Sequence, residues 1–166
     1  MVSNHPPEFL KKLLQFTDNC RRTGLYAAYR GGHREIVERL IAVGANIEAP
    51  HTIGATLFTA SGKGHTGVVE TLPAAGANIH AADREGTTPL YMACHHGHLM
   101  VLERLIVAGA NIEAKFQGFT PLMTACSKGN VQIVEKLLAA GANIEATHRN
   151  GETSLFFPSS LGHRDE

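Results

Sequence analysis

The most constraining feature of this 166-residue chain is a short segment that recurs at nearly constant spacing. GANIEA begins at residue 44 and returns as GANIHA at 76 and as GANIEA at 109 and 141, so the steps are 32, 33 and 32 residues. A second mark keeps the same steps, because GGH lies at 31–33, KGH at 63–65, HGH at 96–98 and KGN at 128–130. Two landmarks that share one period indicate a tandem array of one supersecondary unit.

The third repeat shows why each unit is predicted to be a pair of helices. Thr88 and Pro89 are typical of a helix start, because the hydroxyl caps free amide groups and proline needs no donor in the first turn. This helix is predicted to end at Gly97, and a second helix is predicted between Leu99 and Gly109. The second helices share an apolar stripe: Ile36, Val37, Leu40 and Ile41, then Val101, Leu102, Leu105 and Ile106, then Ile133, Val134, Leu137 and Leu138. One pair cannot bury its stripe alone, so each unit needs neighbours.

The residues between the landmarks carry a resemblance to a known family. TTPLYMACHHGH (87–98) and FTPLMTACSKGN (119–130) closely resemble the T-P-L-H-x-A-x-x-x-G-H core of the ankyrin repeat. The resemblance covers about residues 20–163 and implies an all-α ankyrin-repeat solenoid, in which helix pairs carry protruding β-hairpin-like fingers. The chain, 1–166, is then one domain with repeats at about 20–49, 50–82, 83–114 and 115–146. An N-terminal cap helix is predicted at 7–19 and a partial fifth repeat at 147–166.

Two repeats depart from this pattern. In the second repeat, Ala55 and Thr56 occupy the places of the Thr-Pro pair, and Pro73 falls inside the second helix. An interior proline removes a backbone hydrogen bond and costs about 3 kcal/mol or more, so this helix is predicted to stop near Leu72 or to kink. Pro158 is predicted to break the first helix of the fifth repeat in the same way.

Composition narrows the classes of partner. The formal net charge is zero and the chain has no basic run, so neither nucleic acid nor an anionic membrane is an expected partner. There is no apolar stretch of 18 residues and no apolar leader, which favours a soluble, unsecreted protein. Cys94 and Cys126 share one register in neighbouring repeats, and helices packed about 8–10 Å apart are too distant for a disulfide, which needs Cα atoms within roughly 7 Å. Reduced thiols, with a lone Cys20, fit a cytoplasmic or nuclear protein.

Ten histidines raise the question of a metal site, most of all at His95, His96 and His98. A structural interpretation is stronger, because His98 belongs to the Gly-His landmark together with His33, His65 and His163. Zinc sites need three or four converging ligands, and none completes this set. The nucleophile candidates Ser61, Cys94 and Cys126 lie in core register without a base beside them. We therefore expect no metal, no cofactor and no enzymatic activity.

The ankyrin resemblance implies a noncatalytic module that binds a protein partner through the finger loops and the concave face of the first helices. By this resemblance, the contact positions are the residues that flank the glycine of each finger loop and the two residues before each Gly-His landmark. They are His51, Thr52, Lys63, Arg84, Glu85, Thr87, His95, His96, Phe116, Gln117, Phe119, Ser127, Lys128, His148, Arg149 and Glu152. The aromatic pair Phe116 and Phe119 is the predicted hot spot, unless one ring folds back over a neighbouring hairpin.

Two other functions stay open at this stage. The chain could be a structural spacer segment of a longer ankyrin chain, because its fifth repeat is incomplete. It could also regulate or inhibit an enzyme partner by blocking the active site with its fingers. Because the fourth repeat is half covered, weak self-association through the C-terminal end is a further expectation.

Overall fold

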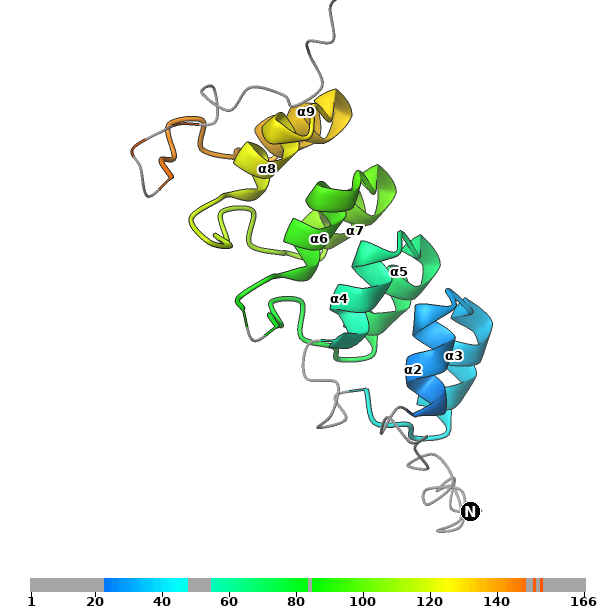
Figure 1. Ribbon diagram of the computed structural model, residues 1–166. Helices are drawn as coiled ribbons and strands as arrows, with labels where there is room; N and C mark the ends of the chain where they lie inside the picture. Colours follow the sequence, from blue (N-terminus) through cyan, green and yellow to red (C-terminus); the bar gives the residue numbers. More distant parts are fainter. Residues whose placement is uncertain (1–22, 48–54, 84, 149–150, 152, 154–166) are drawn as a thin grey trace, which may run out of the picture.

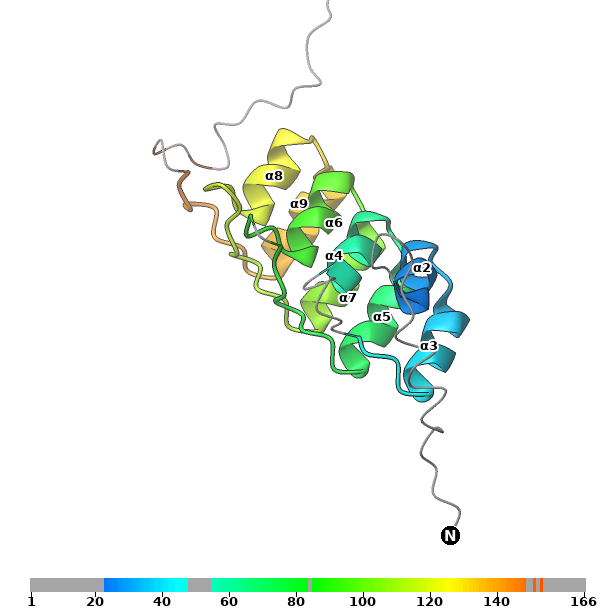
Figure 2. The ribbon, with the colours of Figure 1, turned by 60° about the horizontal axis from the view of Figure 1, so that its bottom comes forward.

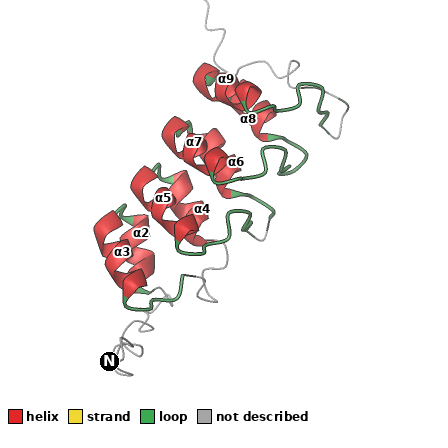
Figure 3. Cartoon of the chain, turned by 180° about the vertical axis from the view of Figure 1, so that it is seen from behind, coloured by secondary structure: helices red, strands yellow, loops and turns green. Residues whose placement is uncertain are grey.

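The computed structural model describes residues 23–47, 55–83, 85–148, 151 and 153, and these residues form four stacked helix pairs (Figure 1). The pairs are α2 (Gly24–Arg30) with α3 (Arg34–Ala42), α4 (Ala55–Gly62) with α5 (Thr66–Ala74), α6 (Pro89–His96) with α7 (Leu99–Val107), and α8 (Pro121–Ser127) with α9 (Val131–Ala139). The first helices α2, α4, α6 and α8 form one row and the second helices form another (Figure 2). The loops between pairs project to one side (Figure 3). The all-α solenoid with fingers is confirmed.

Threonine begins the first helices, as the sequence predicts. The side chain of Thr88 accepts a hydrogen bond from the amide of Tyr91 at 3.2 Å, and Thr120 caps Met123 at the same distance. The second repeat lacks this pair, yet α4 still begins at Ala55. Its Thr56 is buried and donates to the carbonyl oxygen of Ile47 at 2.9 Å. This bond joins α4 to the end of the preceding repeat.

The GANI landmark ends every second helix by one mechanism. In the third repeat Gly109 has φ 87°, the left-handed conformation that glycine adopts without strain. The next amide, of Ala110, donates to the carbonyl of Leu105 at 2.9 Å, as in a Schellman motif, and the Ala110 side chain is buried. The side chain of Asn111 then accepts from the amide of Glu113 at 2.9 Å. The glycine, alanine and asparagine of the landmark therefore each have a structural task.

The Gly-His landmark connects one repeat to the next. The imidazole Nε2 of His65 lies 2.9 Å from the carbonyl oxygen of Arg30, and that of His98 lies 3.1 Å from the carbonyl oxygen of Gly62. The ring of His65 also covers Gly32, where a Cβ atom would lie only 2.6 Å from Nδ1. In the fourth repeat Asn130 replaces histidine, and its side chain accepts from the amide of Ile133 in its own helix. The interpretation of these histidines as structural is supported by their contacts.

The core is a single apolar layer between the two rows of helices. Its largest buried members on the second helices are Val37, Val68, Val69, Leu72, Val101, Leu102, Leu105, Ile133 and Leu137. The predicted stripes match this layer except at their edges, since Ile36 is 50% exposed and Leu138 is 43% exposed. Ile36 lies in the first described pair and Leu138 in the last, where a helix has described neighbours on one side.

For the second repeat, the alternative in which the helix stops near Leu72 is wrong, and the alternative of a kink at Pro73 stays a prediction. Helix α5 runs through Pro73 to Ala74 and has nine residues, as do α3, α7 and α9. Proline removes only one donor here, and it lies in the last turn, where the amide of Ala75 still bonds to the carbonyl of Thr71 at 3.2 Å. The amide of Ala77 also reaches the carbonyl of Leu72 at 3.0 Å, so the Schellman ending is kept. The free-energy cost of Pro73 is therefore smaller than that of a proline in the middle of a helix.

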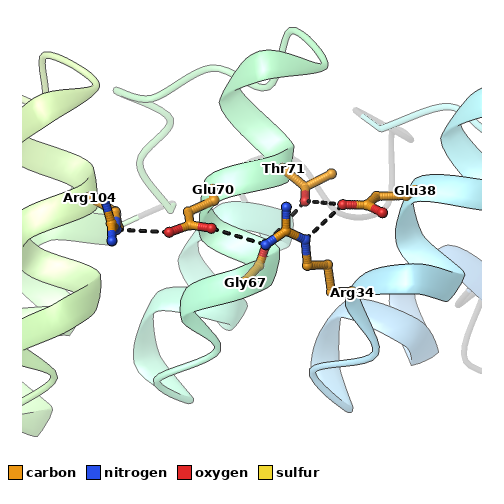
Figure 4. Close-up of polar contacts among 6 residues, drawn as sticks. All are labelled: Arg34, Glu38, Gly67, Glu70, Thr71 and Arg104. Atoms are coloured by element: carbon orange, nitrogen blue, oxygen red, sulfur yellow. Dashed lines mark hydrogen bonds and ion pairs between the residues drawn. The ribbon is translucent and has the colours of Figure 1, made fainter.

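Ion pairs bridge neighbouring second helices on their outer surface (Figure 4). Arg34 of α3 reaches Glu70 of α5 at 3.1 Å, and Glu70 reaches Arg104 of α7 at 2.8 Å. Glu103 of α7 then pairs with Lys136 of α9 at 2.6 Å. The side chains are 29% to 53% exposed, so each pair is worth about 0–1 kcal/mol. Their main consequence is that the charges of the second helices are largely compensated in place.

Candidate partner-binding surface

The finger between α5 and α6 is organised by one carboxylate. Oδ1 of Asp83 accepts from the amide of Glu85 at 2.9 Å and from the amide of Thr87 at 2.8 Å. The amide of Asp83 in turn donates to the carbonyl of Thr87 at 3.1 Å. Glu85 is exposed at the tip, but Thr87 is only 5% exposed. Thr87 therefore exposes little surface to a partner, and its predicted contact with a partner stays a prediction.

The finger between α7 and α8 is a tight hairpin. The amides and carbonyls of Phe116 and Phe119 exchange two hydrogen bonds, of 3.0 and 2.9 Å. The two residues between them, Gln117 and Gly118, have φ values of 52° and 94°. Positive φ at both central residues is the signature of a type I′ turn, which suits the twist of a two-residue hairpin. This finger is thus a defined structural element with an exposed Gln117 at its tip.

The two phenylalanine rings of this hairpin pack on neighbouring repeats. Phe116 lies against Tyr91 of α6, with ring centroids 4.8 Å apart, and Phe119 lies against His148 of the next finger, with centroids 4.4 Å apart. Both rings are half-buried. The alternative that a ring covers a neighbouring hairpin is therefore realised for Phe119, and Phe116 covers a helix. The two rings therefore hold the finger against its neighbours, and their exposed parts offer apolar surface.

A further set of contacts holds the finger between α7 and α8, the third finger, beside the finger that follows α9, the fourth finger. Nζ of Lys115 donates to the carbonyl oxygen of Thr147 at 2.9 Å, and Nε2 of His148 lies 3.2 Å from the carbonyl oxygen of Gln117. An open groove of about 510 Å³ lies between the fingers. Its lining comes from three successive fingers: Glu85, Lys115, Gln117, Gly118, Thr147 and His148. Polar side chains and backbone dominate this groove.

The C-terminal ends of the first helices form the other half of the candidate surface. Lys63, His95, His96 and Lys128 are exposed there, and Ser127 is half-buried. Ser127 donates to the carbonyl of Thr124 at 3.0 Å within its own helix. Five predicted contact residues fall outside the described part of the chain: His51, Thr52, Arg84, Arg149 and Glu152.

Tyr91 connects the fingers to the helix ends, and the sequence-based site omitted it. Its ring contacts Phe116 of the finger on one side and stacks against His95 on the other, with centroids 6.1 Å apart. The repeat register could have indicated it, because Tyr26 and Phe58 occupy the same place in the first two repeats. Burial raises the pKa of Tyr91, and a hydrogen bond with Thr124 offsets part of this effect. The phenol therefore stays neutral at physiological pH.

The described histidines near the ends of the first helices lie beside positive charges or backbone carbonyl oxygens. Burial lowers the pKa of His95, and the nearby positive charges of Lys128 and His96 lower it further. Nδ1 of His96 lies 3.0 Å from the carbonyl of Met92, and Nε2 of His98 faces the carbonyl of Gly62. Within the described ranges no three His, Cys, Asp or Glu side chains are grouped so that they could hold a metal ion.

The buried thiol of Cys94 faces the core of the stack, and burial raises its pKa to about 12. Cys126 is half-buried, and burial raises its pKa as well. A thiol held in the protonated form is a poor nucleophile. Neither group therefore provides a reactive centre at neutral pH.

Comparison with known families agrees with the geometry. The chain matches the family model of ankyrin repeats (3 copies) over residues 1–83, 57–148 and 102–165. The protein therefore belongs to the ankyrin-repeat family. No curated protein matches it significantly. None of the helices in the described ranges has the length and apolar character to cross a membrane.

Proposed function

We propose that this chain is a noncatalytic module that binds one partner protein along its fingers and the ends of its first helices. Ankyrin repeats are generally protein–protein interaction modules, and the match covers nearly the whole chain. The observation that carries the proposal is the position of Tyr91, whose ring contacts both Phe116 of a finger and His95 of a helix end. These contacts make the fingers and the helix ends one continuous surface. Aromatic side chains in such a central place are the ones most often critical for binding.

The test begins with capture of a partner on the tagged protein, followed by titration calorimetry with the purified partner. Tyr91→Ala should weaken binding at least tenfold, since a central aromatic commonly contributes 2 kcal/mol or more. Met100→Ala is the matched control, because Met100 is 50% exposed on the second helix α7, outside this surface. His95→Asp provides a second variant if Tyr91→Ala lowers stability. Equal affinities for all three variants and the wild type would contradict the proposal.

A structural spacer is the second candidate function, and one observation favours it. In the last described pair Leu138 is 43% exposed and Ile144 is 48% exposed, whereas the equivalent Ile106 and Ile112 are half-buried and packed on the core. An apolar edge of this kind suits contact with another repeat or, weakly, with a second copy of the chain. Sedimentation velocity of the wild type and of Ile144→Ser over a range of concentrations tests self-association. A wild type that stays monomeric at millimolar concentration excludes it.

The proposal has two further parts. The protein regulates an enzyme partner, and it is located in the cytoplasm or the nucleus. If the captured partner is an enzyme, its activity should fall when the protein is added in excess, and Tyr91→Ala should restore it. A fluorescent fusion in intact cells tests the compartment. The zero formal net charge supports a protein partner over nucleic acid.

A further inference from the structure

The C-terminal ends of the four first helices carry a line of basic side chains. Each member occupies one of the last two helical positions or the residue that follows: Arg30, Lys63, His95, His96 and Lys128. All five side chains are exposed. We call this set the basic row. Because the first helices stand side by side in the stack, the row runs along the whole array from α2 to α8 (Figure 2).

Among the described residues, the basic row forms no ion pair with a carboxylate. Helices α2, α4, α6 and α8 contain no Asp or Glu. In the part of the chain that the structure describes, none of the five members takes part in an ion pair; the pairs lie on and between the second helices. Lysine plus arginine number 15 in this protein, and aspartate plus glutamate also number 15. The row is therefore produced by segregation of charge and not by a surplus of it.

The helix macrodipole explains only half of this pattern. A basic side chain at a helix C-terminus is favourable by about 0.3–1 kcal/mol, which accounts for the basic residues themselves. The same effect favours Asp and Glu in the first turn, and all four first helices lack them there. The four first helices therefore supply no negative charge of their own beside the basic row, which leaves it available to an anionic ligand.

We propose that the basic row binds an extended acidic segment of a partner protein, with a carboxylate at about every third residue. Packed helices lie about 8–10 Å apart, and an extended chain advances about 3.3 Å per residue, so three residues span one repeat. Hydrogen bonds from lysine or arginine to carboxylates are among the stronger ones at a surface. This inference rests on the proposed function and specifies the chemistry of the partner.

The environment of His95 agrees with this assignment. The positive charge of Lys128, across from α8, and that of His96, in the same helix, disfavour a proton on His95, in addition to burial. Members of the basic row in neighbouring repeats therefore interact electrostatically. A carboxylate placed between Lys128 and His95 would relieve the repulsion.

The experiment uses the full chain and two labelled twelve-residue peptides in fluorescence anisotropy at low ionic strength. One peptide has four glutamates at every third position among Gly and Ser, and the other has the same composition with the glutamates adjacent. The spaced peptide should bind, and the permuted one should bind at least threefold more weakly. Lys63→Gln and Lys128→Gln should each lower the affinity at least threefold and together about tenfold. Arg39→Gln removes the same charge from an exposed position of α3 and should change the affinity less than 1.5-fold.

Several results would overturn the inference. They are equal affinity for the two peptides, an equal loss with Arg39→Gln, or absence of binding at millimolar peptide. A twelve-nucleotide oligothymidylate that binds as tightly, with the same sensitivity to Lys63→Gln, would show a general polyanion site and would also overturn it. If the peptides fail while a captured partner still loses affinity with Tyr91→Ala, the proposed function stands and only the acidic segment is wrong.

Discussion

The imidazole Nε2 of His98 lies 3.1 Å from the carbonyl oxygen of Gly62, so the residue that precedes the second helix of one repeat contacts the end of the first helix of the repeat before it. His65 and Arg30 repeat the contact at 2.9 Å. A buried or half-buried carbonyl that loses its partner costs about 1–3 kcal/mol. The bond is thus one of several polar connections between units that share an apolar core.

The first prediction concerns this connection. His98→Ala should lower the thermal midpoint by about 2–12 °C, as a loss of about 1–3 kcal/mol implies for a chain of this length. His80→Ala is the control, because His80 is exposed and only its backbone amide is bonded, to Asn78. Differential scanning calorimetry of the two variants compares them directly. An equal midpoint for both would show that the imidazole contact contributes nothing to stability.

The second prediction concerns Ser61. Its side chain is fully buried, and its hydroxyl has no hydrogen-bond partner among the described residues. Cys94 and Cys126 occupy the equivalent places with less polar groups. Ser61→Ala should therefore raise the free energy of unfolding by about 1 kcal/mol, because a buried unpaired hydroxyl costs about that much or more. Urea denaturation measures it; a loss of stability would mean that the hydroxyl is bonded after all.

Thr124→Ala serves as the contrast for Ser61→Ala. Thr124 is also buried, but its hydroxyl donates to the carbonyl of Thr120 at 3.1 Å. Its removal should be neutral or destabilising in the same urea experiment.

The third prediction concerns Pro73. Helix α5 continues through this residue, so Pro73→Leu gains one backbone hydrogen bond, worth about 1 kcal/mol, and not the larger gain expected for a broken helix. The thermal midpoint should rise by about 2–4 °C. Leucine is chosen because Leu138 occupies the equivalent place in α9. No rise would show that the last turn of α5 has adjusted fully to proline.

The helices themselves were predictable because their ends are specified locally. Thr88 caps a helix and Gly97, with φ 77°, ends it, and neither depends on the rest of the fold. Pro73 was misjudged because the cost of a proline depends on its distance from the helix end, and that end had to be known to one residue. Pattern alone places a proline in a helix but not in its last turn.

The candidate surface was less predictable because it depends on hydrogen bonds inside the fingers and on contacts with the next repeat. Thr87 resembles an exposed loop residue in sequence, but its amide and carbonyl both bond to Asp83, and it is only 5% exposed. Tyr91 resembles a core residue and instead lies between a helix end and Phe116, which belongs to the next repeat. The repeat pattern marks one unit, but it specifies neither the bonds within a finger nor the neighbour that the next unit supplies.

The fourth prediction concerns pH. The pKa of His95 is lowered in the folded protein, first by burial and then by Lys128 of α8 and His96 of α6. The unfolded chain therefore binds the proton more readily, so the contribution of His95 to stability is present above its unfolded pKa and is lost as the pH falls through the folded value. His95→Gln should make the free energy of unfolding less dependent on pH between about 7 and 5. Urea midpoints at several pH values test this; an unchanged slope contradicts it.

The last prediction separates folding from binding at the Phe116–Phe119 hairpin. Phe116 packs on Tyr91, which belongs to the proposed binding surface, whereas Phe119 packs on His148 of the next finger. Removing either ring should lower stability, because aromatic pairs contribute about 0.5–1.5 kcal/mol beyond the area they bury. Only Phe116→Ala should also lower the affinity for the captured partner at least tenfold, because it removes the ring that positions Tyr91.

Phe119→Ala is thus the matched control for Phe116→Ala, with a similar thermal shift and a smaller loss of affinity. Calorimetry gives the thermal midpoint, and titration below that temperature gives the affinity. If both variants bind as tightly as the wild type, the hairpin only supports the fold, and the contact surface is confined to the basic row. If Phe119→Ala instead loses more affinity, the centre of the interface lies between the third and fourth fingers, over the groove that Gln117 and His148 line.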